Sequence, residues 1–189
     1  VYDGLKFTAT ASLSDKVFEH TVTLNGVSKT YAMTGWRIGY MAGPVELIKA
    51  CAKIQSQSTS NPCSISQKAA AEAINGPQDE VGRMVTEFVK RRDYIMERLN
   101  AIPGVTCPFP RGAFYAMPNF SAYFGKKAGN QVISGSVDLS GFLLEDGHIA
   151  AVAGAAFGED TCIRLSFATS MEKITEGLNR LEASLKKLS

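Results

Sequence analysis

One segment of the chain, from Val81 to Ile102, repeats its hydrophobic positions with the period of an α-helix. The apolar residues that share one helical face are Val81, Met84, Val85, Phe88, Ile95, Leu99 and Ile102. Pro77 suits the first turn of a helix, and Pro103-Gly104 ends one. We therefore predict a long helix over about residues 78–101, roughly 35 Å at 1.5 Å per residue, and expect it to join two parts of the chain.

Three other segments with helical signals precede the last helix: residues 45–56, 64–75 and 138–145, the third with Gly147 as its C-cap. The last helix begins with a capping box made by Thr169 and Glu172. Its apolar stripe is spaced by four, three, four and three residues: Ile174, Leu178, Leu181, Leu185 and Leu188.

Short strands are predicted in four places: residues 20–24, 104–118 (interrupted by prolines), 148–154 and 162–170. In the last of these, three apolar residues alternate with Arg164, Ser166 and Ala168, which is the period of a half-buried strand. The second half therefore looks like a small α+β domain and the first half like the tail of an α/β domain. We place the boundary in the long helix, between residues 1–85 and residues 86–189.

The composition is that of an ordinary soluble globular protein, with 45% hydrophobic and 20% charged residues among 189. A net charge of +2 without a basic run argues against a nucleic-acid partner. No apolar stretch has the length of a membrane span. The four cysteines are scattered and form no CxxC pair, so we expect free thiols in a reducing compartment, the cytoplasm, and no metal site. Because the chain opens with "VYDG" and no methionine, we expect it to begin inside a larger protein.

The stretch "LNGVSKTYAMTGWRIGYMAGP" places Lys29 just after a predicted strand and Arg37 eight residues later. A lysine past a strand end can lie at the mouth of an α/β sheet, where ligands bind. A desolvated lysine can act as an amine nucleophile toward a carbonyl substrate or pyridoxal phosphate. Arg37 offers a guanidinium fork for phosphate oxygens, and Ser28 offers a hydroxyl. The residues alone leave open that Lys29 and Arg37 are solvated surface charges.

This stretch resembles the cofactor-lysine motif of the class I/II pyridoxal-phosphate aminotransferases, the fold type I family. It is similar to the bacterial aspartate aminotransferase branch that includes the aspartate/prephenate enzymes. "QSQSTSNPCSISQKAA", "RGAFYAMP" and "IRLSFATS" also resemble family segments, in family order, so the resemblance covers essentially the whole chain. It implies an α/β fold: the tail of the large pyridoxal-phosphate-binding domain followed by the small α+β C-terminal domain. The chain would then be the C-terminal half of such an enzyme.

The resemblance also implies roles for individual residues. Lys29 would form a Schiff base with pyridoxal 5'-phosphate and, once freed, would be the general base that moves the substrate proton. Arg37 would bind the cofactor phosphate, with Ser28 as a helper. Arg164 would grip the substrate α-carboxylate through a bidentate pair. The strand alternation supports this, because Arg164 points away from the side occupied by its apolar neighbours.

The implied activity is amino-group exchange between aspartate and 2-oxoglutarate, which gives oxaloacetate and glutamate, in a homodimer. Its substrates would be amino acids and 2-oxo acids. Two alternatives stay open: a non-catalytic folded fragment or assembly module, and another enzyme of the same fold, such as a prephenate or aromatic aminotransferase or a β-lyase. The family places an aspartate for the pyridine nitrogen and a tyrosine upstream of "VYDG", so the 189-residue chain would be incomplete by itself.

Weaker candidates follow from the same resemblance. Residues 58–61 match a loop near the neighbouring subunit's cofactor, and a simple turn is the alternative. Gly112, Phe114 and Tyr115 match a segment that is either a substrate-side wall or strand packing. Trp36 is expected to pack. Ala153 departs from the family, which usually has proline there.

Overall fold

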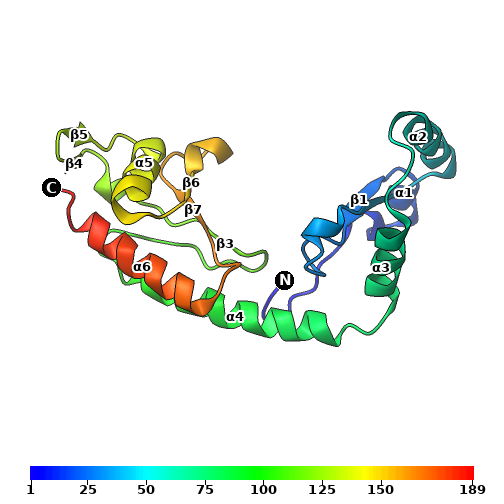
Figure 1. Cartoon of the computed structure of the whole chain (residues 1–189), viewed down its shortest axis with the longest axis horizontal. Helices are drawn as coiled ribbons and strands as arrows, with labels where there is room; N and C mark the ends of the chain where they lie inside the picture. Colours follow the sequence, from blue (N-terminus) through cyan, green and yellow to red (C-terminus); the bar gives the residue numbers. More distant parts are fainter. The chain divides into compact units, whose positions relative to one another are not determined.

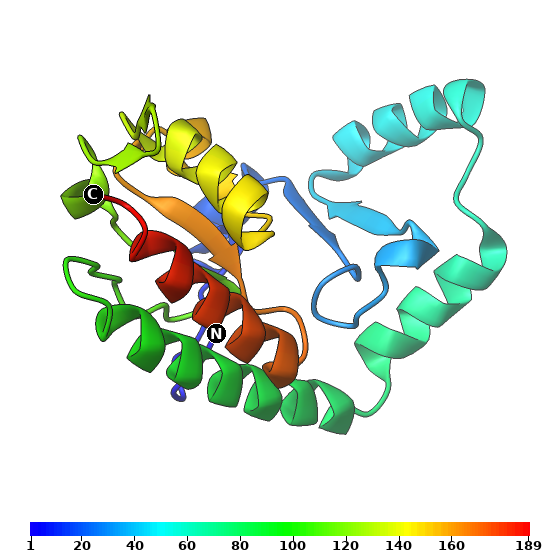
Figure 2. The same ribbon diagram turned by 60° about the vertical axis from the view of Figure 1, so that its left-hand side comes forward.

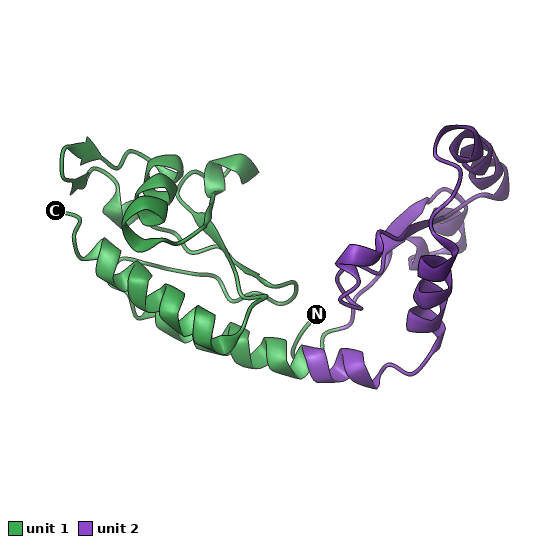
Figure 3. Cartoon of the chain, in the orientation of Figure 1, with its two compact units in different colours: residues 1–5, 85–189 green, residues 6–84 purple.

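The computed structural model describes all 189 residues and divides them into two compact units (Figure 1, Figure 3). Unit 1 comprises Val1–Leu5 and Val85–Ser189, and unit 2 comprises Lys6–Met84. The chain therefore passes from one unit to the other twice, after Leu5 and again after Met84. The second passage lies inside α4, Asp79–Asn100, which is the predicted long helix.

The sequence predicts one boundary, inside the long helix. The two structural units need a second boundary after Leu5, because Val1–Leu5 pack with the residues that follow Met84. Assignment of the units to a large and a small domain stays a prediction. None of the helices combines the length and the apolar character needed to cross a lipid bilayer.

Unit 2 is built from one hairpin and helices around a small core. Its elements are η1 (Thr10–Ser12), α1 (Asp15–Glu19), β1 (Thr23–Gly26), η2 (Thr34–Trp36), β2 (Gly39–Ala42), α2 (Val45–Ser58) and α3 (Ser64–Asn75). The strands β1 and β2 are antiparallel, with Thr23 opposite Ala42 and Gly26 opposite Gly39. The strand predicted from residue 20 starts later because His20 is the C-cap of α1. The unit's buried core residues are Val27, Met33, Ile38 and Ala70.

Unit 1 contains the other elements: β3 (Tyr115–Ala116), η3 (Ser121–Tyr123), β4 (Lys127–Ala128), β5 (Gln131–Val132), α5 (Ser136–Gly147), β6 (Val152–Ala153), η4 (Gly154–Phe157), β7 (Ile163–Ser166) and α6 (Met171–Leu185). Its sheet has the order β3-β7-β6, and both pairings are antiparallel. Figure 2 shows α6 lying along α4 within this unit. The short β4 and β5 form a separate hairpin.

The core of unit 1 gathers the apolar stripes of α4 and α6 over the sheet. The predicted α6 stripe is confirmed, because all five of its residues are buried. From α4, Ile95 and Leu99 are buried, and Ile102 follows them just past the helix end. Residues from the sheet side, Ile163 and Phe167, are fully buried. Since burial of one such side chain is worth about 1.5–3 kcal/mol, these stripes fix α4 and α6 to the sheet.

Local details differ from the sequence predictions at helix ends. The left-handed cap of α5 is His148 (φ 52°), whereas Gly147 is the last helical residue. Gly147 instead leaves room for a neighbouring side chain, because a Cβ there would lie 2.8 Å from Ser184 Oγ. The N-cap of α6 is Ser170, not Thr169, and its side chain accepts a hydrogen bond from the Lys173 N–H.

The strands of unit 1 are also shorter than predicted. Of residues 104–118, only Tyr115–Ala116 form a strand, with an isolated bridge at Thr106. Pro108 and Pro110 lack the N–H that a ladder needs, so this segment cannot pair continuously. Of residues 148–154, only Val152–Ala153 are paired.

Candidate active site

The loop between β1 and β2 carries the lysine that the sequence singles out. Val27, directly after β1, is fully buried, and Met33 and Ile38 are buried with it. Within the loop, the backbone N–H of Ala32 donates to the carbonyl of Lys29 at 3.1 Å. The buried residues anchor the loop at both ends, and the exposed Lys29 lies between them in the chain.

Arg37 and Ser28 belong to the same loop. Arg37 follows η2 in the left-handed conformation (φ 52°, ψ 52°), and its Nη1 donates to the carbonyl of Thr34 at 2.9 Å. A non-glycine residue in this conformation costs about 1–3 kcal/mol and is found preferentially at ligand sites. Arg37 is exposed and Ser28 is half-buried, so both can be reached from solvent.

The donor set of this loop fits an anionic aldehyde. The Lys29 amine can attack a carbonyl carbon, whereas the Arg37 guanidinium and the Ser28 hydroxyl can donate hydrogen bonds to phosphate oxygens. These three groups come from one loop of unit 2 with buried anchors. Lys29, Ser28 and Arg37 thus offer the types of group that a phosphorylated aldehyde requires, and their roles stay a prediction.

Arg164 lies on β7, the central strand of the unit 1 sheet, and is half-buried. Its guanidinium carbon is 4.4 Å from the ring centre of Tyr115 and 4.5 Å from that of Phe157. The side chain donates no hydrogen bond to the protein, and no carboxylate lies within ion-pair distance. Its in-plane N–H groups are thus available to an anion, in a setting where two rings cover part of the cation.

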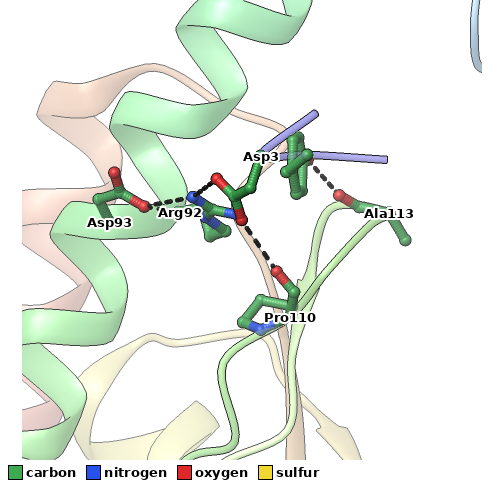
Figure 4. A network of polar contacts seen from close by, with 6 residues as sticks. Asp3, Arg92, Asp93, Pro110 and Ala113 are labelled. Atoms are coloured by element: carbon green, nitrogen blue, oxygen red, sulfur yellow. Dashed lines mark hydrogen bonds and ion pairs between the residues drawn. The ribbon is translucent and has the colours of Figure 1, made fainter. Parts of the chain in front are cut away.

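The sequence patterns missed a second arginine site, at Arg92 on α4 (Figure 4). Arg92 Nη1 and Nη2 donate to the two carboxylate oxygens of Asp3 at 2.7 and 2.9 Å. Its Nε donates to Asp93 at 2.9 Å. Hydrogen bonding to Arg92 holds the pKa of the Asp3 carboxyl below its usual value. A charged residue among the apolar positions of a helix was the available signal, but its partner lies 89 residues away.

Arg92 is also packed between aromatic rings. Its guanidinium carbon lies 4.8 Å from the ring centre of Tyr2 and 4.6 Å from that of Phe109. The Tyr2 hydroxyl in turn donates to the carbonyl of Ala113. This network fastens the first residues of the chain to α4 and to the loop before β3, so its role is structural.

The weaker site candidates from the sequence lie in different parts of the structure. Ser58 is the last residue of α2, and residues 59–61 follow it outside any helix or strand, with Ser60 left-handed (φ 62°). The role of residues 58–61 stays a prediction. Trp36, expected to pack, is 45% exposed. Tyr115 contacts Arg164, as described above. Ser28, Lys29 and Arg37 belong to unit 2, and Arg164 belongs to unit 1.

Known proteins resemble the chain along its whole length. The family model described as aminotransferase class I and II matches residues 1–181. The chain is 49% identical over 184 residues to the aspartate/prephenate aminotransferase of Cereibacter sphaeroides, covering 97% of this chain and 46% of that protein. It is 47% identical over 190 residues to an aspartate aminotransferase of Rhizobium meliloti, covering 100% and 46%. The chain thus spans about half the length of the curated relatives it matches.

Solved structures give the same picture. The crystal structure of the aspartate aminotransferase from Rhizobium meliloti has a TM-score of 0.95 at 47% identity and covers 100% of this chain and 48% of that one. The aromatic aminotransferase from Pyrococcus horikoshii has a TM-score of 0.87 at 35% identity, with 98% and 48% covered. The predicted fold type I architecture is confirmed, and the chain belongs to the aminotransferase class I and II family.

Proposed function

We propose that the protein carrying this chain is an aspartate aminotransferase that uses pyridoxal 5'-phosphate. It exchanges an amino group between aspartate and 2-oxoglutarate and forms oxaloacetate and glutamate. The observation that carries the proposal is the high identity, along nearly the whole chain, to relatives named aspartate aminotransferase.

Three residues of unit 2 would hold the cofactor. Lys29 would hold it through its amine, and the Arg37 guanidinium and Ser28 hydroxyl would donate to its phosphate. When bound, pyridoxal phosphate supplies an electron sink for the pair left at the substrate α-carbon. The support is the chemistry of this loop: a nucleophilic amine and two phosphate donors between buried anchors.

The residues of the chain would divide the remaining work. Once freed from the cofactor, the Lys29 amine would accept the proton from the substrate α-carbon as a general base. It would then donate that proton to the cofactor C4′ as a general acid. Arg164 would bind the substrate α-carboxylate with two parallel N–H donors. Its half-buried position and the contact of its guanidinium with the rings of Tyr115 and Phe157 support this role.

The same proposal includes assembly and location. Unit 2 would be part of the large domain and unit 1 most of the small domain of a homodimer, on the strength of the family resemblance. The four free cysteines support a reducing compartment, the cytoplasm. A second candidate acceptor is prephenate, because the Cereibacter relative is named an aspartate/prephenate aminotransferase. Rates of transfer from glutamate to oxaloacetate and to prephenate separate the two activities.

The test maps the cofactor lysine. The protein is incubated with pyridoxal 5'-phosphate, reduced with borohydride and digested, and the adducts are located by mass spectrometry. We expect one phosphopyridoxyl adduct, on Lys29. Lys29→Ala should lose the adduct and lower turnover at least about 10³-fold, because the general base is removed.

Lys68 supplies the matched control, because it is an exposed lysine on α3 of the same unit. Lys68→Ala should keep both the adduct on Lys29 and full turnover. Adducts spread over many lysines, or transamination that survives Lys29→Ala, would favour the non-catalytic alternative and overturn the proposal.

A further inference from the structure

We propose that Tyr115 and Phe157 are positioning residues that hold the Arg164 guanidinium between their rings and present its in-plane donors to the α-carboxylate of the substrate. This inference rests on the proposed function and adds two residues to it. We call the three side chains the aromatic clamp.

The sheet register explains why Tyr115 reaches Arg164. Tyr115 lies opposite Ser166 in the β3–β7 pair, so Arg164 is two residues away on the same face of the sheet. Diagonal neighbours of this kind lie within reach of aromatic and long side chains. Tyr115 thus approaches the guanidinium from the β3 side of the central strand.

Phe157 approaches the guanidinium from the β6 side of the central strand. Arg164 lies opposite Val152 of β6, and η4 follows β6 directly and ends at Phe157. Phe157 is 50% exposed, so it is not a core residue. Its packing on a cation gives this half-exposed ring a specific contact.

The η4 turn that carries Phe157 is fixed to the chain leading into β7. The Gly154 N–H donates to the Cys162 carbonyl at 2.9 Å, and the Glu159 N–H donates to the Gly154 carbonyl at 3.1 Å. A Cβ at Gly154 would overlap the carbonyl oxygens of both partners, so only glycine allows this approach. The turn therefore sets where the Phe157 ring lies over Arg164.

A buried serine secures the same turn from α5. Ser136 is fully buried; its hydroxyl accepts a hydrogen bond from the Ala155 N–H at 3.1 Å and donates to Asp160 at 2.6 Å. The position of Phe157 thus depends on a backbone that is tied at several points. Such a support is what a preorganised binding group needs.

The N–H donors of the Arg164 guanidinium indicate the function of the aromatic clamp, because they have no acceptor in the chain. Two of the arginines of unit 1 that contact rings also meet carboxylates of the chain: Arg98 donates to Glu182, and Arg92 donates to Asp3. Arg91, which contacts the Phe88 ring, forms no ion pair. Arg164 has rings but no acceptor. Two rings restrict a long flexible side chain before the ligand arrives, and the free edge matches a carboxylate in bidentate geometry. The clamp should therefore strengthen binding of every substrate that carries an α-carboxylate.

The experiment compares aspartate with 3-aminopropanoate, which is aspartate without its α-carboxylate. The measured quantity is the ratio of the two kcat/KM values in the amino-donor half-reaction. We expect Phe157→Leu and Tyr115→Leu each to lower this ratio about 10-fold, the size of a partly desolvated cation–π contact. The change should lie in KM for aspartate, with kcat nearly unchanged. Phe157→Tyr keeps a ring and should keep the wild-type ratio.

Phe18→Leu is the control, because Phe18 is an exposed phenylalanine of unit 2. An unchanged ratio in both leucine variants, or an equal fall in Phe157→Tyr, would overturn the clamp. If Phe157→Leu does not fold, Tyr115→Leu and Phe157→Tyr still decide. Failure of the proposed function is a separate result, since the unmodified protein would then transfer no amino group from aspartate.

Discussion

Arg92 and Arg164 both lie between two aromatic rings of unit 1, and they differ in what meets the hydrogen-bonding edge. The ring centres lie 4.8 and 4.6 Å from the Arg92 guanidinium carbon and 4.4 and 4.5 Å from that of Arg164. Arg92 donates in bidentate fashion to Asp3, whereas Arg164 has no acceptor from the chain. Arg92 therefore shows, within the same unit, how a carboxylate completes such an arrangement.

The difference in burial matches the difference in partners. Arg92 is 2% exposed, and a guanidinium that is removed from water needs carboxylates to offset its desolvation. Arg164 is half-buried, so water can solvate its edge until an anion replaces it. Ring stacking alone therefore does not identify a binding arginine. A binding arginine is indicated when its guanidinium stacks on rings and its N–H groups face solvent without a carboxylate partner.

The largest expected effect tests the proposed substrate-binding role of Arg164. Arg164→Lys should raise KM for aspartate about 100-fold, because a lysine offers a point charge in place of a bidentate fork. Steady-state kinetics with aspartate and glutamate measure it. Arg111→Lys, at an exposed arginine of the same unit, should leave KM unchanged. An unchanged KM in Arg164→Lys would remove this residue from the substrate site.

A smaller effect is expected at the structural arginine. Arg92→Met should lower the free energy of unfolding by about 2 kcal/mol, because it removes a buried hydrogen-bonded cation that other groups depend on. Arg83→Met supplies the control on the same helix, since the Arg83–Glu80 pair is exposed and should contribute no more than about 0.5 kcal/mol. Both are measured by denaturant unfolding. Equal losses in the two variants would contradict the structural role.

The smallest effect concerns pH. The pKa of Asp3 is lowered in the folded protein by its hydrogen bonds from Arg92, so its contribution to stability is present above the ordinary aspartate pKa of about 4. This contribution is lost as pH falls through the lower, folded pKa. Unfolding midpoints measured between pH 6 and pH 2 should therefore drop less steeply in Asp3→Asn than in the unmodified protein. Parallel curves would show that the pair adds nothing to acid stability.

The helices could be predicted from the sequence because their signals are local. The helix over residues 64–75 has the predicted bounds, and the α6 stripe is buried as predicted. The strands could not be bounded in this way. Their lengths depend on which residues find partners, and residues 104–118 pair over only two positions as a strand.

The site residues also divide into those that are close in sequence and those that are brought together by long-range pairing. Lys29, Ser28 and Arg37 come from one short motif, so the sequence brings them together, although their roles stay predictions. The partners of Arg164 come from residues 115 and 157, which meet it only through the register of the sheet. The Arg92–Asp3 pair joins residues 89 positions apart. Arg92 has a local signal, a charge among apolar helix positions, but nothing in the sequence points to Asp3 as its partner. The long-range partners of Arg164 and Arg92 therefore could not be predicted from the sequence.

The assignment of Val1–Leu5 to unit 1 has a consequence for the order of events during synthesis. Tyr2 leaves the ribosome well before its partners: its backbone N–H donates to the carbonyl of Arg111 and its hydroxyl to that of Ala113, 111 residues later. At 5–20 residues per second, that delay is roughly 5–20 seconds. All of residues 6–84 are made in the interval. Val1–Leu5 can therefore join the rest of unit 1 only after the whole of unit 2 has been synthesised.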